Sequence, residues 1–400
     1  MIKVYAIKSI LSKDSKKVED DSLNLIKELE NELKEEFILV DDVKRLDNFS
    51  LILVQTGGSE GFFKRDIYPY FNGPYYLLTY GSNNSLAASL EILSFIKNEG
   101  KRGEVLHGSV SYIAKRIKDL RNSSNSNTYR LGVFGIPSDW LISSDVNYKK
   151  CLDTFNISLI DVNQEEIIEE LKKYHEECPK GLFDTTFNKV ELNKAYNIYL
   201  GLKAIVDKYN LNGFTIRCFD IIKALNTSSC LALSMFNDEG ITATCEGDIP
   251  SLITMFILQN KFHSQSFQAN PNWIAPEKNE ITLAHCTLPL KMTKGYTFDT
   301  HFESGIGLGI HGELDLSDVT IVKISSNLEL FYVEEGAIIK NEYRQDRCRT
   351  QIVIRLNGDA AYFLTSSLGN HHLVIYGKRK KEIQVYLRSL GLREVIWERQ

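Results

Sequence analysis

No stretch of the sequence is apolar for long enough to cross a bilayer. The N-terminal segment Met1–Ile7 runs into polar residues at 12–15, so it lacks the long apolar core of a signal peptide. From these two absences we expect a protein that neither inserts into a membrane nor enters the secretory route.

The sequence also lacks an excess of basic residues. It has 47 Lys and Arg against 52 Asp and Glu, which gives a net charge of -5 and an isoelectric point near 6.0. Because the basic residues are scattered among acidic neighbours, they form no electrostatic footprint for a polyanion. We therefore expect no nucleic-acid partner.

Closely paired cysteines of the CxxC type are absent. The seven cysteines lie singly at 151, 178, 218, 230, 245, 286 and 348. An odd number at such wide spacing indicates reduced thiols and excludes both a disulfide framework and a paired-cysteine zinc site. The expected location is the cytoplasm.

What is present is a globular composition with an alternating pattern in the first third. At 400 residues, 43% hydrophobic and 25% charged, the chain is long enough for two or three domains. Ser22 is expected to cap a first helix, and a second helix begins near Ser85. Short apolar runs alternate with these helices, which predicts a parallel α/β sheet. The predicted strands are Lys3–Ile7, Phe37–Val40, Leu51–Gln55 and Tyr75–Thr79.

A polar segment at 122–128 has only turn-forming side chains and is expected to link two domains. After it the strand-and-helix pattern restarts, and from about residue 268 short strands separated by turns predominate. We therefore predict two doubly wound, Rossmann-like α/β domains at 1–125 and 126–267, and a β-rich, barrel-like domain at 268–400. Residues 54–60 form a glycine-bearing turn after a strand, which suits either a ligand contact or a simple tight turn.

The most informative segment is 244–250, which places Glu246 and Asp248 before an apolar helix. Pro250 suits the first turn of that helix, and a helix N-terminus tolerates negative charge. Capping requires only one of the two acids. The pattern is thus open to two interpretations, a helix cap alone or a cap beside a functional carboxylate.

Histidines next to predicted strands supply nitrogen ligands. His285 follows a short apolar strand, and His371 and His372 precede another. Adjacent residues of a strand face opposite ways, so only one of this last pair enters a given site. The glycine-rich residues 300–312 contain two histidines, Glu303 and a GxG pair, but no helix follows, so they are only weak evidence for a nucleotide site. The nitrogen and oxygen donors together suit a manganese-like ion rather than a thiolate zinc site.

These segments resemble the L-fucose and L-arabinose isomerases. Cys245–Asp248 is similar to the family segment whose glutamate binds the metal and transfers a proton, which implies those roles for Glu246. Leu283–His285 and Gly369–His371 are similar to segments that supply histidine ligands, so His371 is preferred to His372. Two longer segments, 135–142 and 301–305, are similar to uncharacterised relatives in the same broad group.

One departure from the family pattern concerns Asn270. It stands where the family carries a second acidic ligand and base. Asparagine can bind a hard cation through its carbonyl oxygen, but it cannot take up a proton. The second base is then Asp248, Glu303 or a metal-bound hydroxide, or the chemistry differs.

The resemblance predicts a manganese-dependent, or other divalent-metal-dependent, aldose–ketose isomerase that acts on a monosaccharide through an ene-diolate. Glu246 and Asp248 are the expected catalytic residues. The expected metal ligands are Glu246, Asn270, His285 and His371, and the expected sugar-binding residues are Arg217, Asn370 and Glu303. By analogy the protein is a homo-oligomer, a trimer or hexamer. The alternatives are a non-catalytic sugar-binding or regulatory protein, and an epimerase or lyase that uses the same ene-diolate chemistry.

Overall fold

In the computed structural model, residues 1–12, 15–47, 49–124, 128–183 and 185–395 are described. The chain divides into two compact units, Met1–Asn127 and Thr128–Gln400. No helix within the described ranges is long and apolar enough to span a membrane. The expected linker at 122–128 lies partly outside the described residues, and helix α4 (Val110–Ser124) continues into its first part.

The first unit is built on a five-stranded parallel sheet in the order β2-β1-β3-β4-β5. Helices cover both of its faces. Helices α1 and α4 pack on one face, and α3 packs on the other together with the short helical segment 60–67. The doubly wound arrangement predicted for this part is present. The elements are β1 (Ile2–Ile7), α1 (Lys16–Leu33), β2 (Phe37–Val40), β3 (Leu51–Val54), β4 (Tyr75–Leu78), α3 (Ser85–Asn98) and β5 (Gly103–Leu106).

The predicted helix cap at Ser22 is wrong. Helix α1 begins at Lys16, because Val18 extends the buried stripe of the helix one turn towards the N-terminus. Ser22 lies inside the helix, where its hydroxyl donates to the Glu19 carbonyl and accepts a hydrogen bond from the Gln55 side chain at 2.7 Å. A hydroxyl satisfied in this way is tolerated in a helix interior.

The second unit begins with a four-stranded parallel sheet in the order β7-β6-β8-β9. One face packs against α6, α7, α8 and α9, and the other against α5 and α10. Strand β8 ends at Ile216, directly before Arg217, and Cys218 starts a helix. The elements are β6 (Tyr129–Phe134), α5 (Tyr148–Phe155), β7 (Ile157–Val162), α6 (Gln164–Leu171), α7 (Lys189–Tyr209), β8 (Gly213–Ile216), α8 (Cys218–Leu225), α9 (Cys230–Asp238), β9 (Thr242–Cys245) and α10 (Ile249–Phe262).

The rest of the second unit contains a closed antiparallel barrel of six strands, in the order β14-β17-β10-β11-β16-β15 with β15 returning to β14. Leu283, Ile321, Ile352 and Val374 are among the apolar side chains of its core. The predicted barrel-like region is therefore confirmed. Its strands are β10 (Phe267–Ala275), β11 (Glu280–His285), β14 (Asp318–Ile324), β15 (Leu330–Glu342), β16 (Thr350–Leu356) and β17 (His372–Tyr376).

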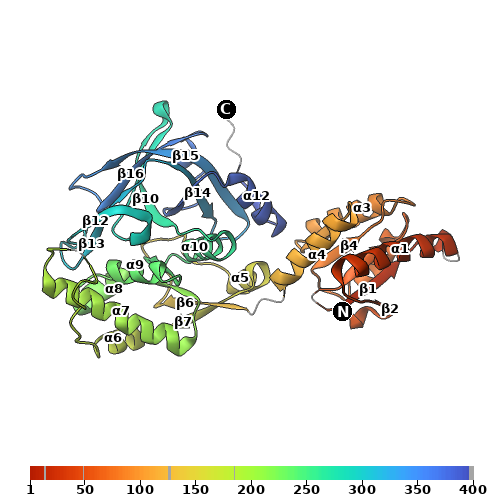
Figure 1. The fold of residues 1–400 in the computed structure, drawn as a ribbon, viewed down its shortest axis with the longest axis horizontal. Coiled ribbons are helices and arrows are strands. Elements are labelled where there is room, and N and C mark those ends of the chain that lie inside the picture. Colours follow the sequence, from red (N-terminus) through yellow and green to blue (C-terminus); the bar gives the residue numbers. More distant parts are fainter. Residues whose placement is uncertain (13–14, 48, 125–127, 184, 396–400) are drawn as a thin grey trace. The chain divides into compact units, whose positions relative to one another are not determined.

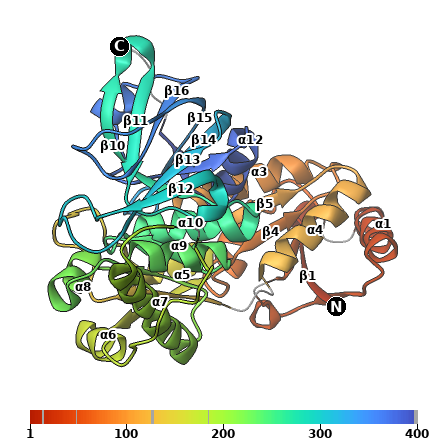
Figure 2. The same cartoon turned by 60° about the vertical axis from the view of Figure 1, so that its left-hand side comes forward.

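Helix α10 joins the parallel sheet to the barrel. Nearly all of its side chains are buried, and it packs against the sheet on one side and against β14 and β17 on the other (Figure 1). The hairpin of β12 (Thr293–Asp299) and β13 (Gly309–Leu314) lies between the barrel and α9 (Figure 2). Helix α12 (Lys380–Ser389) and the short strand β18 (Arg393–Glu394) pack on β15. The N-terminus of α10 is thereby held where sheet and barrel meet.

Candidate metal centre

Glu246 lies in the turn between β9 and α10, and its backbone is in the left-handed region with φ of 64°. Residues other than glycine, asparagine and aspartate rarely adopt this backbone conformation. The turn is fixed from both sides: the Ser138 hydroxyl donates to the Glu246 carbonyl, and Gly247 donates its N–H to the Ile216 carbonyl at 3.0 Å. A side chain at Gly247 would press on Ser138 at 3.0 Å. Strain of this kind is typical of functional sites.

Three of the residues singled out in the sequence come together at this turn. The Glu246 Oε1 atom lies 3.5 Å from Nε2 of His285, at the end of β11, and 3.6 Å from Nε2 of His371, just before β17. Their candidate ligand atoms all lie within 4.8 Å of one another. Two donors that each bind one ion at about 2.1 Å lie roughly 3.0–3.5 Å apart at bond angles near those of octahedral or tetrahedral coordination. The spacing therefore suits a shared divalent cation.

Asp248 orients His371. Its Oδ2 accepts a hydrogen bond from Nδ1 of His371 at 2.8 Å, so Nε2 is the ring nitrogen that faces Glu246. Asp248 also caps α10 through the Ser251 N–H at 2.9 Å and lies 3.3 Å from the ammonium of Lys323. Carboxylate–histidine pairs of this kind hold metal-binding imidazoles in the correct tautomer. Of the two acids in the segment, Asp248 provides the cap and Glu246 faces the histidines.

The electrostatics of the cluster match a site for positive charge. Burial opposes ionisation of Glu246, but the two histidines outweigh it and hold its pKa well below the ordinary value. Burial alone would lower the pKa of His371, yet Glu246 and Asp248 raise it to about 9. Burial and the charge of His371 lower the pKa of His285. At neutral pH a proton on His371 thus supplies the positive charge that the carboxylates attract.

Three of the expected metal ligands each have a buried polar atom without a hydrogen-bond partner in the described residues. Within the described part of the chain, Nε2 of His285 and Nε2 of His371 make no hydrogen bond, and neither does Oδ1 of Asn270. Asn270 pairs in the barrel with Ala284, the residue that precedes His285 on the neighbouring strand β11. Unpartnered buried polar atoms are costly and rare. These residues therefore fit a hard divalent cation with nitrogen and oxygen ligands.

His285 is held less firmly than His371. The backbone N–H of Thr287 donates to its Nδ1 at 3.3 Å, which places the ring hydrogen on Nε2 and directs it at Glu246. Binding of an ion through Nε2 would require this hydrogen to move to Nδ1 or to leave. His372, the neighbour that the sequence analysis rejected as a ligand, is bonded to the Tyr362 hydroxyl at 3.2 Å and stays outside the cluster.

The three residues expected to bind the sugar lie in different environments. Glu303 is an exposed residue, and its pKa is raised by partial desolvation of its carboxyl group and by the nearby charge of Glu246. Asn370 is exposed beside Lys323 and Asp248 in a small pocket. Arg217 is engaged by protein groups, namely Asp220 at 2.6 Å, Asp139 at 3.2 Å and the Pro137 carbonyl at 3.2 Å.

Sequence reasoning missed Trp140 and His301. The Trp140 indole N–H donates to Oε2 of Glu246 at 3.3 Å. His301 is buried, and its pKa is lowered to about 4 by burial and by the nearby His285. Trp140 lies in segment 135–142 and His301 in segment 301–305, and the resemblance of these two segments to other proteins was the one sequence signal for them. No spacing rule connects a loop before α5 with a turn more than 100 residues later.

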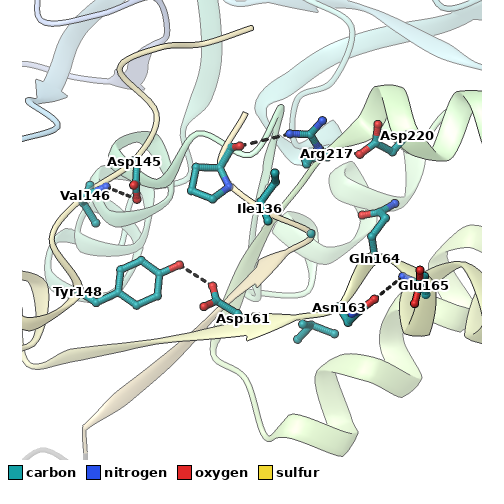
Figure 3. A pocket seen from close by; sticks show the side chains of 13 residues that line it. Ile136, Asp145, Val146, Tyr148, Asp161, Asn163, Gln164, Glu165, Arg217 and Asp220 are labelled. Carbon is teal, nitrogen blue, oxygen red and sulfur yellow. Dashed lines mark hydrogen bonds and ion pairs between the residues drawn. The ribbon is translucent and has the colours of Figure 1, made fainter. Parts of the chain in front are cut away.

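A larger cavity opens at the carboxyl ends of β6, β7 and β8, with a volume of about 720 Å³. Figure 3 shows the Asp161 carboxylate accepting a hydrogen bond from Tyr148, and Arg217 reaching both Asp220 and the loop after β6. The lining carries more carboxylates than cations, so this cavity disfavours anions. Its acidic members are Asp145, Asp161, Glu165 and Asp220.

The chain is similar to sulfoquinovose isomerases. It is 25% identical over 283 residues to one from Clostridium sp. (strain MSTE9), a stretch that spans 62% of this chain and 60% of that relative. It is 23% identical over 303 residues to those of Priestia aryabhattai and Priestia megaterium, which spans 71% of this chain and 68% of each relative. No family model matches the sequence. These relatives support a sugar isomerase, and the resemblance to the fucose and arabinose isomerases in particular stays a prediction.

Proposed function

We propose that this chain is a divalent-metal-dependent isomerase that interconverts an aldose and its ketose. The observation that carries the proposal is the convergence of Glu246, His285 and His371, in which His371 is oriented by Asp248. The similarity to proteins named sulfoquinovose isomerase supports the reaction class and makes that sulfonated aldose the first sugar to test. Manganese is the proposed ion, and a homo-oligomer is the proposed assembly.

The site residues have two proposed roles, metal binding and proton transfer. His285, His371, Glu246 and the amide oxygen of Asn270 would hold the ion, which on binding would acidify the proton at C2 of an open-chain sugar and stabilise the ene-diolate. Glu246 stays ionised at neutral pH, so its carboxylate can accept that proton and return it to C1. Moving the proton between adjacent carbons converts the aldose into the ketose.

The second proton must move between the two sugar oxygens. Asn270 cannot transfer it, and Asp248 is a poor candidate because its carboxylate is buried and bonded to His371, Ser251 and Lys323. Glu303 is the better candidate. Desolvation and the nearby charge of Glu246 raise its pKa, which therefore lies closer to neutrality than that of an ordinary glutamate.

Asn270 also favours a second function. A chain that has lost its second acid can keep metal and sugar binding without turnover, as a sugar-binding or regulatory protein. Exchange of the C2 proton with solvent separates the two functions, because a non-catalytic binder does not remove that proton.

The experiment incubates the manganese-loaded protein in deuterated water with sulfoquinovose and a panel of neutral aldoses and ketoses, followed by NMR. A ketose product with deuterium incorporated supports the isomerase, whereas a C2 epimer or a cleaved product would assign an epimerase or lyase instead. Metal and sugar binding without exchange across the panel would overturn the proposal in favour of the binding protein.

A further inference from the structure

The two oxygens of the Glu246 carboxylate have different surroundings. Oε1 faces Nε2 of His285 and of His371 at 3.5 and 3.6 Å. Oε2 accepts the indole N–H of Trp140 at 3.3 Å. One oxygen therefore points to the ion position and the other is turned to a donor from a separate loop.

That loop, between β6 and α5, is fastened to both sides of Glu246. The Ser138 hydroxyl donates to the Glu246 carbonyl, and the Ser144 hydroxyl donates to the Ser138 carbonyl at 3.0 Å. On the other side, the N–H of Ile249 donates to the Ser144 carbonyl at 3.1 Å. The loop and the Glu246 turn thus form one bonded unit, so the placement of the indole follows from the same contacts that hold the glutamate backbone.

The indole ring packs against two side chains, with 37% of the residue left exposed. The guanidinium of Arg217 stacks 4.7 Å from its centroid, and the ring of Phe219 meets it edge-on at 5.1 Å. Arg217 in turn is held by Asp220 and by the Pro137 carbonyl (Figure 3). A ring packed on a guanidinium and an aromatic edge has little rotational freedom. Its N–H can therefore hold Oε2 in one direction.

We propose that Trp140 is a positioning residue for the isomerisation, one that keeps Glu246 bound to the ion through Oε1 alone and leaves Oε2 to move the substrate proton. This inference rests on the proposed function. A carboxylate oxygen has lone pairs for more than one hydrogen bond, so Oε2 can accept the indole N–H and still take up the C2 proton. Without the indole, the carboxylate is free to turn and bind the ion with both oxygens.

The test compares Trp140→Phe with Trp273→Phe in the full manganese-loaded protein. Trp273 is a matched control because it is 62% exposed on β10. A hydrogen bond to a charged group is worth about a tenfold change in rate or more. We expect Trp140→Phe to lower kcat about tenfold, with KM changed less than about twofold, and Trp273→Phe to leave both unchanged.

A kcat for Trp140→Phe equal to that of the parent protein would overturn the inference. If KM rises while kcat stays constant, the indole contacts the sugar instead, which would also overturn the inference. If Trp140→Phe does not fold, judged by its thermal transition, benzothienylalanine at this position removes the N–H while retaining the bicyclic ring. The same loss of kcat is then expected.

A second readout does not depend on turnover. The infrared carboxylate stretches of the manganese-loaded protein, assigned to Glu246 by comparison with Glu246→Gln, separate one-oxygen from two-oxygen binding. We expect the one-oxygen pattern in the parent protein and the two-oxygen pattern in Trp140→Phe. Identical spectra would refute the positioning role. Absence of turnover in the parent, with these spectral differences present, would refute the proposed function alone.

Discussion

Replacing Asp248 with Asn removes the negative charge behind His371 with little change of shape. Asn caps helices about as well as Asp, so the bond to the Ser251 N–H is expected to survive. The charge-assisted bond to Nδ1 of His371, now 2.8 Å long, is weakened. Loss of such an orienting partner lowers metal affinity by about 10- to 100-fold. That range corresponds to about 1.4–2.7 kcal/mol.

The same substitution also leaves Lys323 without its carboxylate. Its side chain is 2% exposed, and its ammonium lies 3.3 Å from Asp248. Breaking a buried ion pair by removing one partner costs about 3–5 kcal/mol of stability. Asp248→Asn combined with Lys323→Met removes both charges, so we expect it to recover most of the stability but none of the metal affinity.

The assay is calorimetric titration of Mn²⁺ into each purified variant, with thermal unfolding recorded in parallel. Asp42→Asn is the control, because Asp42 caps a short helical turn in the first unit through the Lys44 N–H at 2.9 Å. A Kd for Asp248→Asn within twofold of the parent value would refute the orienting role of Asp248. Recovery of metal affinity in the double variant would show instead that the unpaired charge of Lys323 caused the loss of affinity in Asp248→Asn.

Two further predictions concern the ligands. Burial opposes the charge of His371, but Glu246 and Asp248 raise its pKa to about 9, so its proton must leave before an ion binds. We therefore expect the affinity for Mn²⁺ to rise about tenfold per pH unit from pH 7 to 9 and then to level off. Titration of the protein with Mn²⁺ at several pH values measures this. A flat profile would contradict the assignment. Asn270→Asp adds a charged ligand and a second acid, so we expect tighter Mn²⁺ binding and a higher kcat in a steady-state assay. A lower kcat would show instead that the reaction requires the amide side chain of Asn270.

Local chemistry explains why part of the site was predictable. Glu246, His285 and His371 stand next to strand ends, and side chains at strand ends meet when the strands share a sheet edge or a barrel rim. The pattern of Pro250 and two acids indicated a helix start, but only the fold decides which acid caps it. Asp248 does so, which leaves Glu246 for the histidines.

The missed contacts are those that depend on tertiary packing. Trp140 reaches Glu246 across 106 residues of sequence, and Lys323 reaches Asp248 across 75. Neither contact has a periodicity or a spacing by which it can be recognised. The Ser22 cap failed for a related reason, because a hydroxyl before an apolar stripe is equally acceptable inside a helix when a partner such as Gln55 satisfies it.

Among the fold predictions, the parallel sheets and the closed barrel are confirmed, since alternating strands and helices and short turn-bounded strands are strong signals. The two boundaries between the three proposed domains stay predictions. The second compact unit contains both the four-stranded sheet and the barrel, with α10 packed between them. A buried helix shared by two layers gives no sequence signal that distinguishes it from the core of either layer.

The central claim is that Glu246 and a divalent ion at the histidine pair together labilise the C2 proton of an aldose. The most direct measurement is C2 proton–deuterium exchange by NMR in chelator-treated protein, before and after addition of Mn²⁺, with Glu246→Gln alongside. The account predicts exchange only in the parent protein with Mn²⁺, and a ketose forming with it. Exchange that is equally fast without metal, or in Glu246→Gln, would contradict it.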